Sequence, residues 1–206
     1  AAATVLQGLS PKPGASRYVR FNLGVALIKS GDTAGGSALL DTLGAEPAED
    51  EEVRSLRDKA NVALGFAELG LDHPSEARNA LQRVRLEGLM SNKALLGFGW
   101  AAAADKEPRK ALVPWAELAT RDLSDAAVLE ARIAVPYALA EVGALVAALD
   151  GYRKAIDDFA LENQRLDKSI AAIRVGALFE VPAGSVSADQ MGWLREIERL
   201  PAMPHP

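Results

Sequence analysis

The stretch VPYALAEVGALVAALDGYRKAI, residues Val135–Ile156, decides the fold. Small and apolar residues recur through it, and Gly143 separates two segments that each have the periodicity of an α-helix. In the second segment Ala148, Tyr152 and Ala155 stand four and three residues apart, which places them on one helix face. The stretch therefore predicts two antiparallel helices joined by a short turn at the glycine.

The same arrangement occurs three more times earlier in the chain. Each copy begins with an apolar residue followed by a small one: Leu23-Gly24, Leu64-Gly65, Leu96-Gly97 and, in degenerate form, Val135-Pro136. Each second segment carries a cluster with steps of four and three residues: Gly36, Leu40, Leu43; Ala77, Leu81, Val84; Ala111, Trp115, Leu118; and Ala148, Tyr152, Ala155. The copies lie 32 to 41 residues apart, a period typical of stacked helical repeats that bury a shared core. The third copy has two additional residues before its second cluster, and we expect a longer turn there, around Asp105 to Pro108.

The composition favours an all-α class. The 206 residues are 49% hydrophobic and 25% charged but only 5% aromatic, whereas a sheet protein would need more β-branched and aromatic residues. The formal net charge of −5 provides no basic patch for a polyanion. We therefore expect helices packed on helices and no nucleic acid among the partners.

The repeated residues resemble the tetratricopeptide repeat (TPR) family. Gly143 matches the family's turn between helices, and Ala148, Tyr152 and Ala155 match its alanine, aromatic and alanine positions. The family's leading tryptophan is missing from all four copies, and Gly36 replaces its alanine in the first. The resemblance extends from about Arg17 to Phe159 and implies a right-handed solenoid of antiparallel helix pairs, closed by a C-terminal capping helix.

A closer resemblance is to the middle of larger TPR proteins predicted to be periplasmic in Gram-negative bacteria. It rests on segments such as DKANVALGFAEL (58–69), NKALLGFGWA (92–101) and RLDKSIAAI (165–173). This resemblance implies a periplasmic location, with the cytoplasm as the alternative, because the absence of cysteine suits both compartments. The chain begins at Ala1 without an initiator methionine, so we expect it to be a piece of a longer protein.

Three regions follow from these patterns. Residues 1–16 are the remnant of a preceding repeat and a linker, residues 17–160 are about four degenerate TPR-like pairs, and residues 161–206 are a helical C-terminal extension or cap. The helical pattern continues past Phe159 to about Val175, either as one long helix or as a helix broken near Asn163. Ser187 and Gln190 then form a capping box that opens a last helix containing Trp193.

The sequence contains no motif with a recognisable catalytic role. Its two histidines, His73 and His205, have no partner pattern, and no nucleophile, zinc or phosphate-binding motif is present. The acidic run Ala45–Glu52 fits a solvated helix start better than a metal site. The apolar run Ile133–Leu149 approaches the length of a membrane span, but Glu141 and the turn at Gly143 argue against one. We expect a non-enzymatic protein with no cofactor, no metal and no membrane span in this chain.

The resemblance also implies where a partner binds. In the family, the first helices of successive pairs line a concave surface, and contacts come from positions two before and two after the leucine of each Leu-Gly pair. The resulting partner-binding candidates are Phe21, Val25, Val62, Phe66, Phe98, Ile133 and Tyr137, with Ala94 at the remaining position. None is the lysine or asparagine that holds a peptide carboxylate, so an apolar protein or peptide partner is expected, such as an amphipathic helix.

Two other interpretations stay open at the level of sequence. The same apolar positions are typical of core residues packed between neighbouring helices, in which case no open groove exists. The repeats can also be purely architectural, extending a longer solenoid whose binding sites lie outside this chain. An enzyme or small-molecule sensor would need polar groups that converge on a cavity, and the sequence does not display them.

Overall fold

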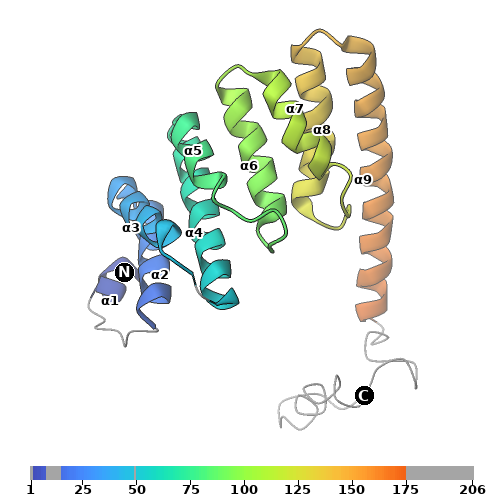
Figure 1. Cartoon of the computed structure of the whole chain (residues 1–206). Helices are drawn as coiled ribbons and strands as arrows, with labels where there is room; N and C mark the ends of the chain where they lie inside the picture. Colours follow the sequence, from blue (N-terminus) through green and yellow to red (C-terminus); the bar gives the residue numbers. More distant parts are fainter. Residues whose placement is uncertain (1, 8–14, 49, 175–206) are drawn as a thin grey trace. The chain divides into compact units, whose positions relative to one another are not determined.

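The computed structural model describes residues 2–7, 15–48 and 50–174, and these residues form helices and no strands. The helices are α1 (Ala2–Gln7), α2 (Ala15–Ser30), α3 (Thr33–Ala45), α4 (Glu51–Gly70), α5 (Pro74–Leu81), α6 (Ser91–Ala104), α7 (Pro108–Leu118), α8 (Ala126–Glu141) and α9 (Leu145–Arg174). From α2 onward they alternate as antiparallel pairs, α2/α3 to α8/α9 (Figure 1). The expected all-α solenoid of helix pairs is confirmed. The capping helix expected around Trp193 lies outside the described residues.

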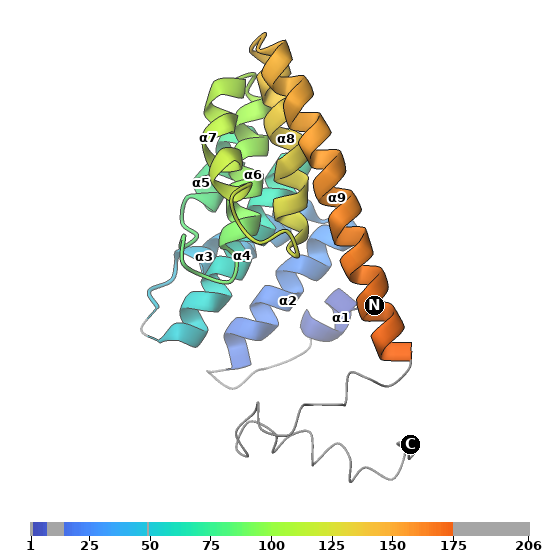
Figure 2. The same ribbon diagram turned by 90° about the vertical axis from the view of Figure 1, so that its right-hand side faces the viewer.

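The chain divides into two compact units, Ala1–Ala160 and Leu161–Pro206, and the stacked pairs belong to the first. Within it, α2 contacts α4, α4 contacts α6 and α6 contacts α8, so the first helices of successive pairs form one continuous layer (Figures 1 and 2). The second helices α3, α5 and α7 each pack between their own first helix and the next one. This is the stacking that lets neighbouring repeats share a core.

All four turns inside the pairs have the same backbone geometry. In each, a residue with positive φ follows the first helix: Gly31 (98°), Asp72 (62°), Lys106 (60°) and Gly143 (82°). The next residue donates its N–H to the carbonyl five positions earlier, as in Ala144 to Leu139 at 2.9 Å. These are Schellman turns, which satisfy the carbonyls at a helix end. The turn predicted at Gly143 is confirmed, but the longer turn expected near Asp105 is wrong, because this turn has the same geometry as the others. The offset of two residues arises within α6, where Gly99 rather than Gly97 approaches the second helix of its own pair at Trp115.

Small residues allow the two helices of a pair to approach closely. A Cβ built at Gly36 would lie 2.5 Å from the Gly24 carbonyl oxygen, and one at Gly65 would lie 2.5 Å from Leu81 Cγ. In the last pair, a Cβ at Gly151 would lie 2.9 Å from Pro136 Cβ. Each distance is shorter than a real side chain could adopt, so these positions set the separation of the helices.

Trp115 on α7 is the largest fully buried side chain among the described residues. Its ring packs edge-on against Trp100 with 4.8 Å between ring centroids, and its Nε1 donates a 3.0 Å hydrogen bond to the Leu96 carbonyl. The partner for Nε1 makes burial of the indole possible without an unsatisfied donor. Gly99 provides the space, because a Cβ there would lie 2.1 Å from Nε1. The packing of α6 on α7 thus explains the glycine at position 99.

Replacing Trp115 with alanine should lower the free energy of unfolding by about 3–5 kcal/mol, because it removes a fully buried indole and leaves a cavity. Urea denaturation followed by circular dichroism measures the change. Val113→Ala on the same helix is the matched control, since Val113 is largely exposed and should change stability little. Equal effects of the two substitutions would contradict the packing described for α7.

Gly99→Ala should destabilise the protein by about 1–3 kcal/mol, because the new methyl group would collide with the Trp115 indole. Gly70→Ala is the control, since it also lies within a helix but has open space around its Cβ position. That substitution should leave the free energy of unfolding unchanged or raise it by about 0.4–1 kcal/mol, because alanine reduces the conformational entropy of the unfolded chain. Thermal melting of the two variants side by side tests the difference in sign.

Candidate functional site

The layer of first helices carries the candidate partner-binding residues at different depths. Phe66, Ile133 and Tyr137 are exposed, with 38%, 45% and 40% of their surface accessible. Phe21, Val25 and Phe98 are half-buried, and Val62 is buried with 7% accessible. Only the first three of the seven residues are therefore exposed on this layer.

Phe66 of α4 lies against the following first helix. Its Cε2 would be only 3.1 Å from a Cβ built at Gly97 of α6, so the missing side chain at Gly97 makes room for the ring. The Cε2 and Cζ edge of the ring lies against α6, while more than a third of the residue's surface stays accessible. The packing holds the ring in place and reduces the side-chain entropy that a partner would have to remove on binding.

Tyr137 of α8 lies beside Trp100 of α6. Their ring centroids are 6.3 Å apart with an interplanar angle of 38°, a spacing typical of interacting aromatic pairs. Trp100 Nε1 donates a 2.7 Å hydrogen bond to Glu130 Oε1, which fixes the indole from the side of α8. The contact between Trp100 and Tyr137 could not be predicted from the sequence, because the spacing of the two residues along the chain contains no signal for it.

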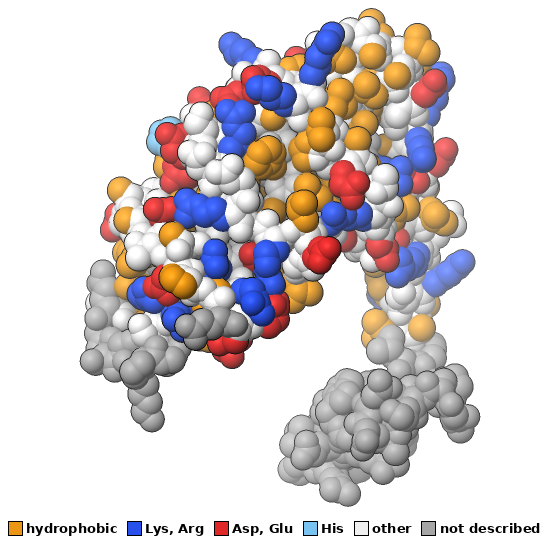
Figure 3. All heavy atoms as spheres, in the orientation of Figure 1, with side chains coloured by type: hydrophobic (Ala, Val, Ile, Leu, Met, Phe, Trp, Pro, Cys, Tyr) orange, Lys and Arg blue, Asp and Glu red, His pale blue; other side chains and the backbone are white. Residues whose placement is uncertain are grey.

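The remaining candidates mostly serve the core. Phe21 and Val25 pack against the buried cluster around Leu40, whereas Phe98 packs against the cluster that contains Val62. Ala94, which shares this second cluster, is also buried. The interpretation that the candidate positions are core residues therefore applies to Phe21 and Val25 of α2 and to Val62. On the face drawn in Figure 3, hydrophobic side chains gather over the later helix pairs, and charged side chains are more frequent over the earlier ones.

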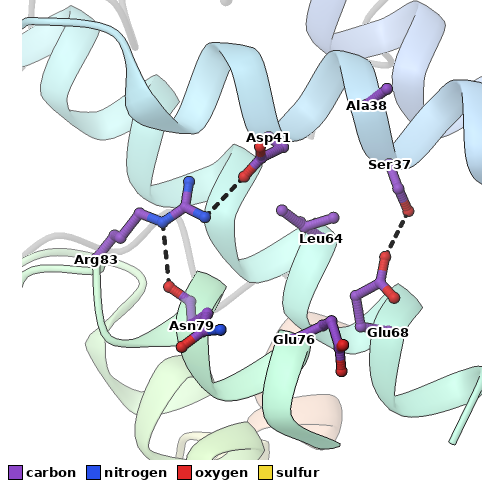
Figure 4. Close-up of a pocket in the computed structure, with 8 residues that line it drawn as sticks. All are labelled: Ser37, Ala38, Asp41, Leu64, Glu68, Glu76, Asn79 and Arg83. Atoms are coloured by element: carbon purple, nitrogen blue, oxygen red, sulfur yellow. Dashed lines mark hydrogen bonds and ion pairs between the residues drawn. The ribbon is translucent and has the colours of Figure 1, made fainter. Parts of the chain in front are cut away.

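A pocket of about 320 Å³ lies between α3, α4 and the α5 region, and several polar and charged side chains line it beside Ala38 and Leu64. Figure 4 shows Arg83 facing Asp41 on one side of the pocket and Ser37 facing Glu68 on the other, with Leu64 between them. Arg83 Nη2 is 2.7 Å from Asp41 Oδ1, and Ser37 Oγ donates a 2.8 Å hydrogen bond to Glu68 Oε1. These pairs join the second helix of one repeat to the next repeat, which gives them a structural role.

The buried Glu68 has a second partner that the sequence did not reveal. His73 Nδ1 lies 3.0 Å from Glu68 Oε2, across the turn that ends α4. Sequence analysis assigned His73 no partner, because the two residues are five positions apart and only the left-handed conformation of Asp72 brings them together. Glu68 is thus held from both sides, which offsets the cost of burying a carboxylate.

The acidic run that begins at Ala45 is more than a solvated helix start. Asp50 caps α4 as expected, because its Oδ1 accepts a 2.7 Å hydrogen bond from the Val53 N–H. Glu46 also forms two ion pairs: its Oε2 lies 3.1 Å from Arg17 Nε, and its Oε1 lies 2.5 Å from Arg20 Nη1. These ion pairs tie α2 to the loop before α4, so Glu46 and Asp50 already have partners within the chain.

Arg85 connects two carboxylates of α4. Its Nε is 2.8 Å from Oδ2 of the buried Asp58, and its Nη1 is 2.8 Å from Glu51 Oε2. Hydrogen bonding from Arg85, assisted by Arg54, lowers the pKa of Glu51 from its ordinary value of 4.5 to about 2. The two carboxylates in turn raise the pKa of the Arg85 guanidinium. This network holds the loop after α5 against α4.

The described residues contain neither a metal-binding cluster nor a membrane-spanning helix. Within them, no group of three or more histidine and carboxylate side chains is arranged to hold a metal ion. No helix among them combines the length and the apolar character that a membrane crossing requires. The most informative surface of the described part is therefore the exposed aromatic and apolar row on the first helices.

Comparison with solved structures supports this fold. The structure titled MamA MSR-1 C2 superposes with a TM-score of 0.61 at 17% sequence identity, covering 78% of this chain and 87% of that chain. A second structure, of a MamA point mutant, gives a TM-score of 0.57 at 18% identity, covering 76% of this chain and 85% of that one. The sequence matches no family model and no curated protein. At these identities the likeness shows the fold alone, which is a TPR-like helical solenoid.

Glu51→Gln should reduce stability in a pH-dependent manner. The pKa of Glu51 is lower in the folded protein, so its ionised form stabilises the fold above the ordinary pKa of 4.5. This contribution disappears as pH falls towards about 2. Urea denaturation at several pH values should therefore show a difference between the parent and the variant that shrinks across this range. In an Arg85→Met background most of the difference should be absent, whereas an undiminished difference would exclude Arg85 as its main cause.

Proposed function

We propose that this chain is a non-enzymatic scaffold that binds a protein or peptide partner on the layer of first helices, with Phe66, Ile133 and Tyr137 as anchors. The observation that carries the proposal is the exposure of these three large side chains on one continuous layer of a TPR-like solenoid. Large aromatic and aliphatic side chains that remain accessible beside well-packed neighbours are typical of interaction surfaces.

The chemistry of the surface favours an apolar partner segment. Phe66 rests on α6, and Tyr137 is supported by Trp100, so both rings are held by packing before a partner arrives. Ile133 lies one helical turn before Tyr137 on α8 and extends the same apolar row. An amphipathic helix with apolar residues at positions i, i+3, i+4 and i+7 would match such a row.

The location of the protein belongs to the same proposal. The resemblance to periplasmic TPR proteins supports a partner in the envelope of a Gram-negative bacterium. Fractionation of a producing strain, with periplasmic and cytoplasmic marker proteins, tests this part independently of binding.

Selection from a library of helical peptides against the intact chain provides a defined ligand. We expect amphipathic peptides to be enriched, and Phe66→Ala combined with Tyr137→Ala to weaken their binding by a free energy on the order of 2 kcal/mol, roughly a 30-fold loss. Fluorescence anisotropy with a labelled peptide measures the affinity, and circular dichroism verifies that the variant keeps its helical fold.

The matched control carries two alanine substitutions of other exposed apolar residues, Leu86→Ala and Val113→Ala, which lie outside the first helices. This control should bind the peptides like the parent. Equal losses in both variants, or enriched peptides that bind the double variant undiminished, would argue against the proposed surface.

The alternative function is purely architectural, with these repeats extending a longer solenoid. Two residues of α9, Leu149 and Ile156, are exposed and support this alternative. In the first pair, the residues at the same repeat positions of α3 contact the next repeat. These residues are Ser37, bonded to Glu68, and Gly44, packed against Asn61. This alternative predicts that no selected peptide depends on Phe66 and Tyr137.

A further inference from the structure

One face of α9 carries an apolar stripe along the whole helix. With 30 residues, α9 is the longest helix in the described part of the chain, and it continues unbroken past Asn163. The stripe consists of Leu145, Leu149, Tyr152, Ile156, Phe159, Asn163, Leu166, Ile170 and Ile173. Most of these side chains are strongly exposed, including Ile156 at 69% and Leu166 at 51%. Such a continuous apolar stripe on a water-exposed helix indicates that another element covers it.

The spacing of the stripe is that of a coiled coil. Its members follow one another in strictly alternating steps of four and three residues, which correspond to the a and d positions of consecutive heptads. In this register Leu149, Ile156, Asn163 and Ile170 occupy a positions. A single asparagine at an a position in an otherwise apolar core is a feature that sets register and partner number in two-stranded coils.

Other faces of α9 already have partners. Ala148 and Ala155 are buried, Gly151 contacts Pro136 of α8, and Asp158 is 3.3 Å from Arg132 of α8. These four residues occupy g and c positions, beside the stripe rather than on it. The α8 contact therefore leaves the a and d positions accessible, which a second helix could cover without displacing α8.

The length of the stripe argues for an occupant with a stripe of its own. In the earlier pairs, a second helix of 8 to 13 residues is enough to receive the next repeat, whereas the α9 stripe extends over 29 residues. Residues 175–206 contain Gly176, Pro182, Gly184 and Pro201, so they offer no uninterrupted helical pattern of that length. A second copy of the chain has a matching stripe by definition.

We propose that α9 is a dimerisation helix, and that two copies of the chain associate through this stripe as a parallel, in-register, two-stranded coiled coil. Parallel alignment places Asn163 beside Asn163 of the second copy, where one amide can donate to the other's oxygen. Antiparallel alignment in the register that pairs Arg153 with Asp167 would place Asn163 against Phe159 and leave the amide unpaired in an apolar layer. Parallel alignment does bring Glu162 near Asp167 of the second copy. That repulsion is reduced because Glu162 Oε2 is paired with Arg165 Nη1 of its own helix at 3.5 Å.

Sedimentation of the intact chain over a dilution series tests the association. The parent should sediment as a dimer that dissociates on dilution, and the variant Leu166→Glu with Ile170→Glu should remain monomeric throughout. The matched control, Gln164→Glu with Ala171→Glu, adds the same charge at exposed positions off the stripe and should dimerise like the parent. Circular dichroism verifies the helical content of each variant. A parent that is monomeric throughout, or a stripe variant that still dimerises, would overturn the proposal.

Cysteine cross-linking tests the alignment and does not depend on the charged variants. The chain has no cysteine, so a single introduced thiol gives an unambiguous result. Under mild oxidation, Ile170→Cys should yield a disulfide-linked dimer, because a positions of parallel helices face each other across the coil. Lys168→Cys, at an outward f position, should not. A dimer in which Ile170→Cys fails to cross-link would exclude the parallel alignment.

Discussion

The close approach of paired helices at small residues is the contact on which the rest of the structure depends. Where Gly24 meets Gly36, and where Gly65 meets Leu81, there is no room for a further carbon atom. This approach sets the separation of the two helices and lets the leucines of one repeat reach the first helix of the next. Because neighbouring repeats bury their apolar faces together, the geometry of each pair determines the fit of the following one.

The same geometry creates the candidate partner surface. Since first helices contact first helices along the stack, their outward side chains form a row that no second helix of the described pairs separates. Gly97 has a double role in this arrangement, because its missing side chain accommodates both Leu81 from the core and Phe66 from the surface. The position of an exposed aromatic ring is thus fixed by the same close contact that stabilises the repeat.

The sequence was sufficient for the helix pairs because their signals are local and periodic. The turn at Gly143 followed from glycine's tolerance of positive φ, but Asp72 and Lys106 adopt the same conformation without that signal. Helical periodicity also placed Val62 and Phe66 on one face, four residues apart. It could not show that Ala94 and Phe98 cover the first while the second stays accessible. The Glu68 to His73 contact escaped detection for a related reason, because it depends on a turn conformation that no residue type announced.

Polar side chains complete what apolar packing leaves unspecified. Apolar contacts between helices tolerate small sliding movements, whereas the buried Asp58 must keep its Arg85 partner to avoid an uncompensated charge. The buried Glu68 must likewise keep its contacts with Ser37 and His73, because an unpaired buried carboxylate oxygen is costly. The Ser37–Glu68 contact joins α3 to α4 and so fixes the register of one repeat on the next, whereas the Asp58–Arg85 contact holds the loop after α5 against α4 of the same pair. In α9 the stripe contains a comparable polar residue, Asn163, among apolar neighbours. Inside the solenoid such groups find partners in the same chain. If the stripe is buried in an interface, the Asn163 amide must also be hydrogen-bonded. This favours a partner helix that has an amide side chain opposite Asn163.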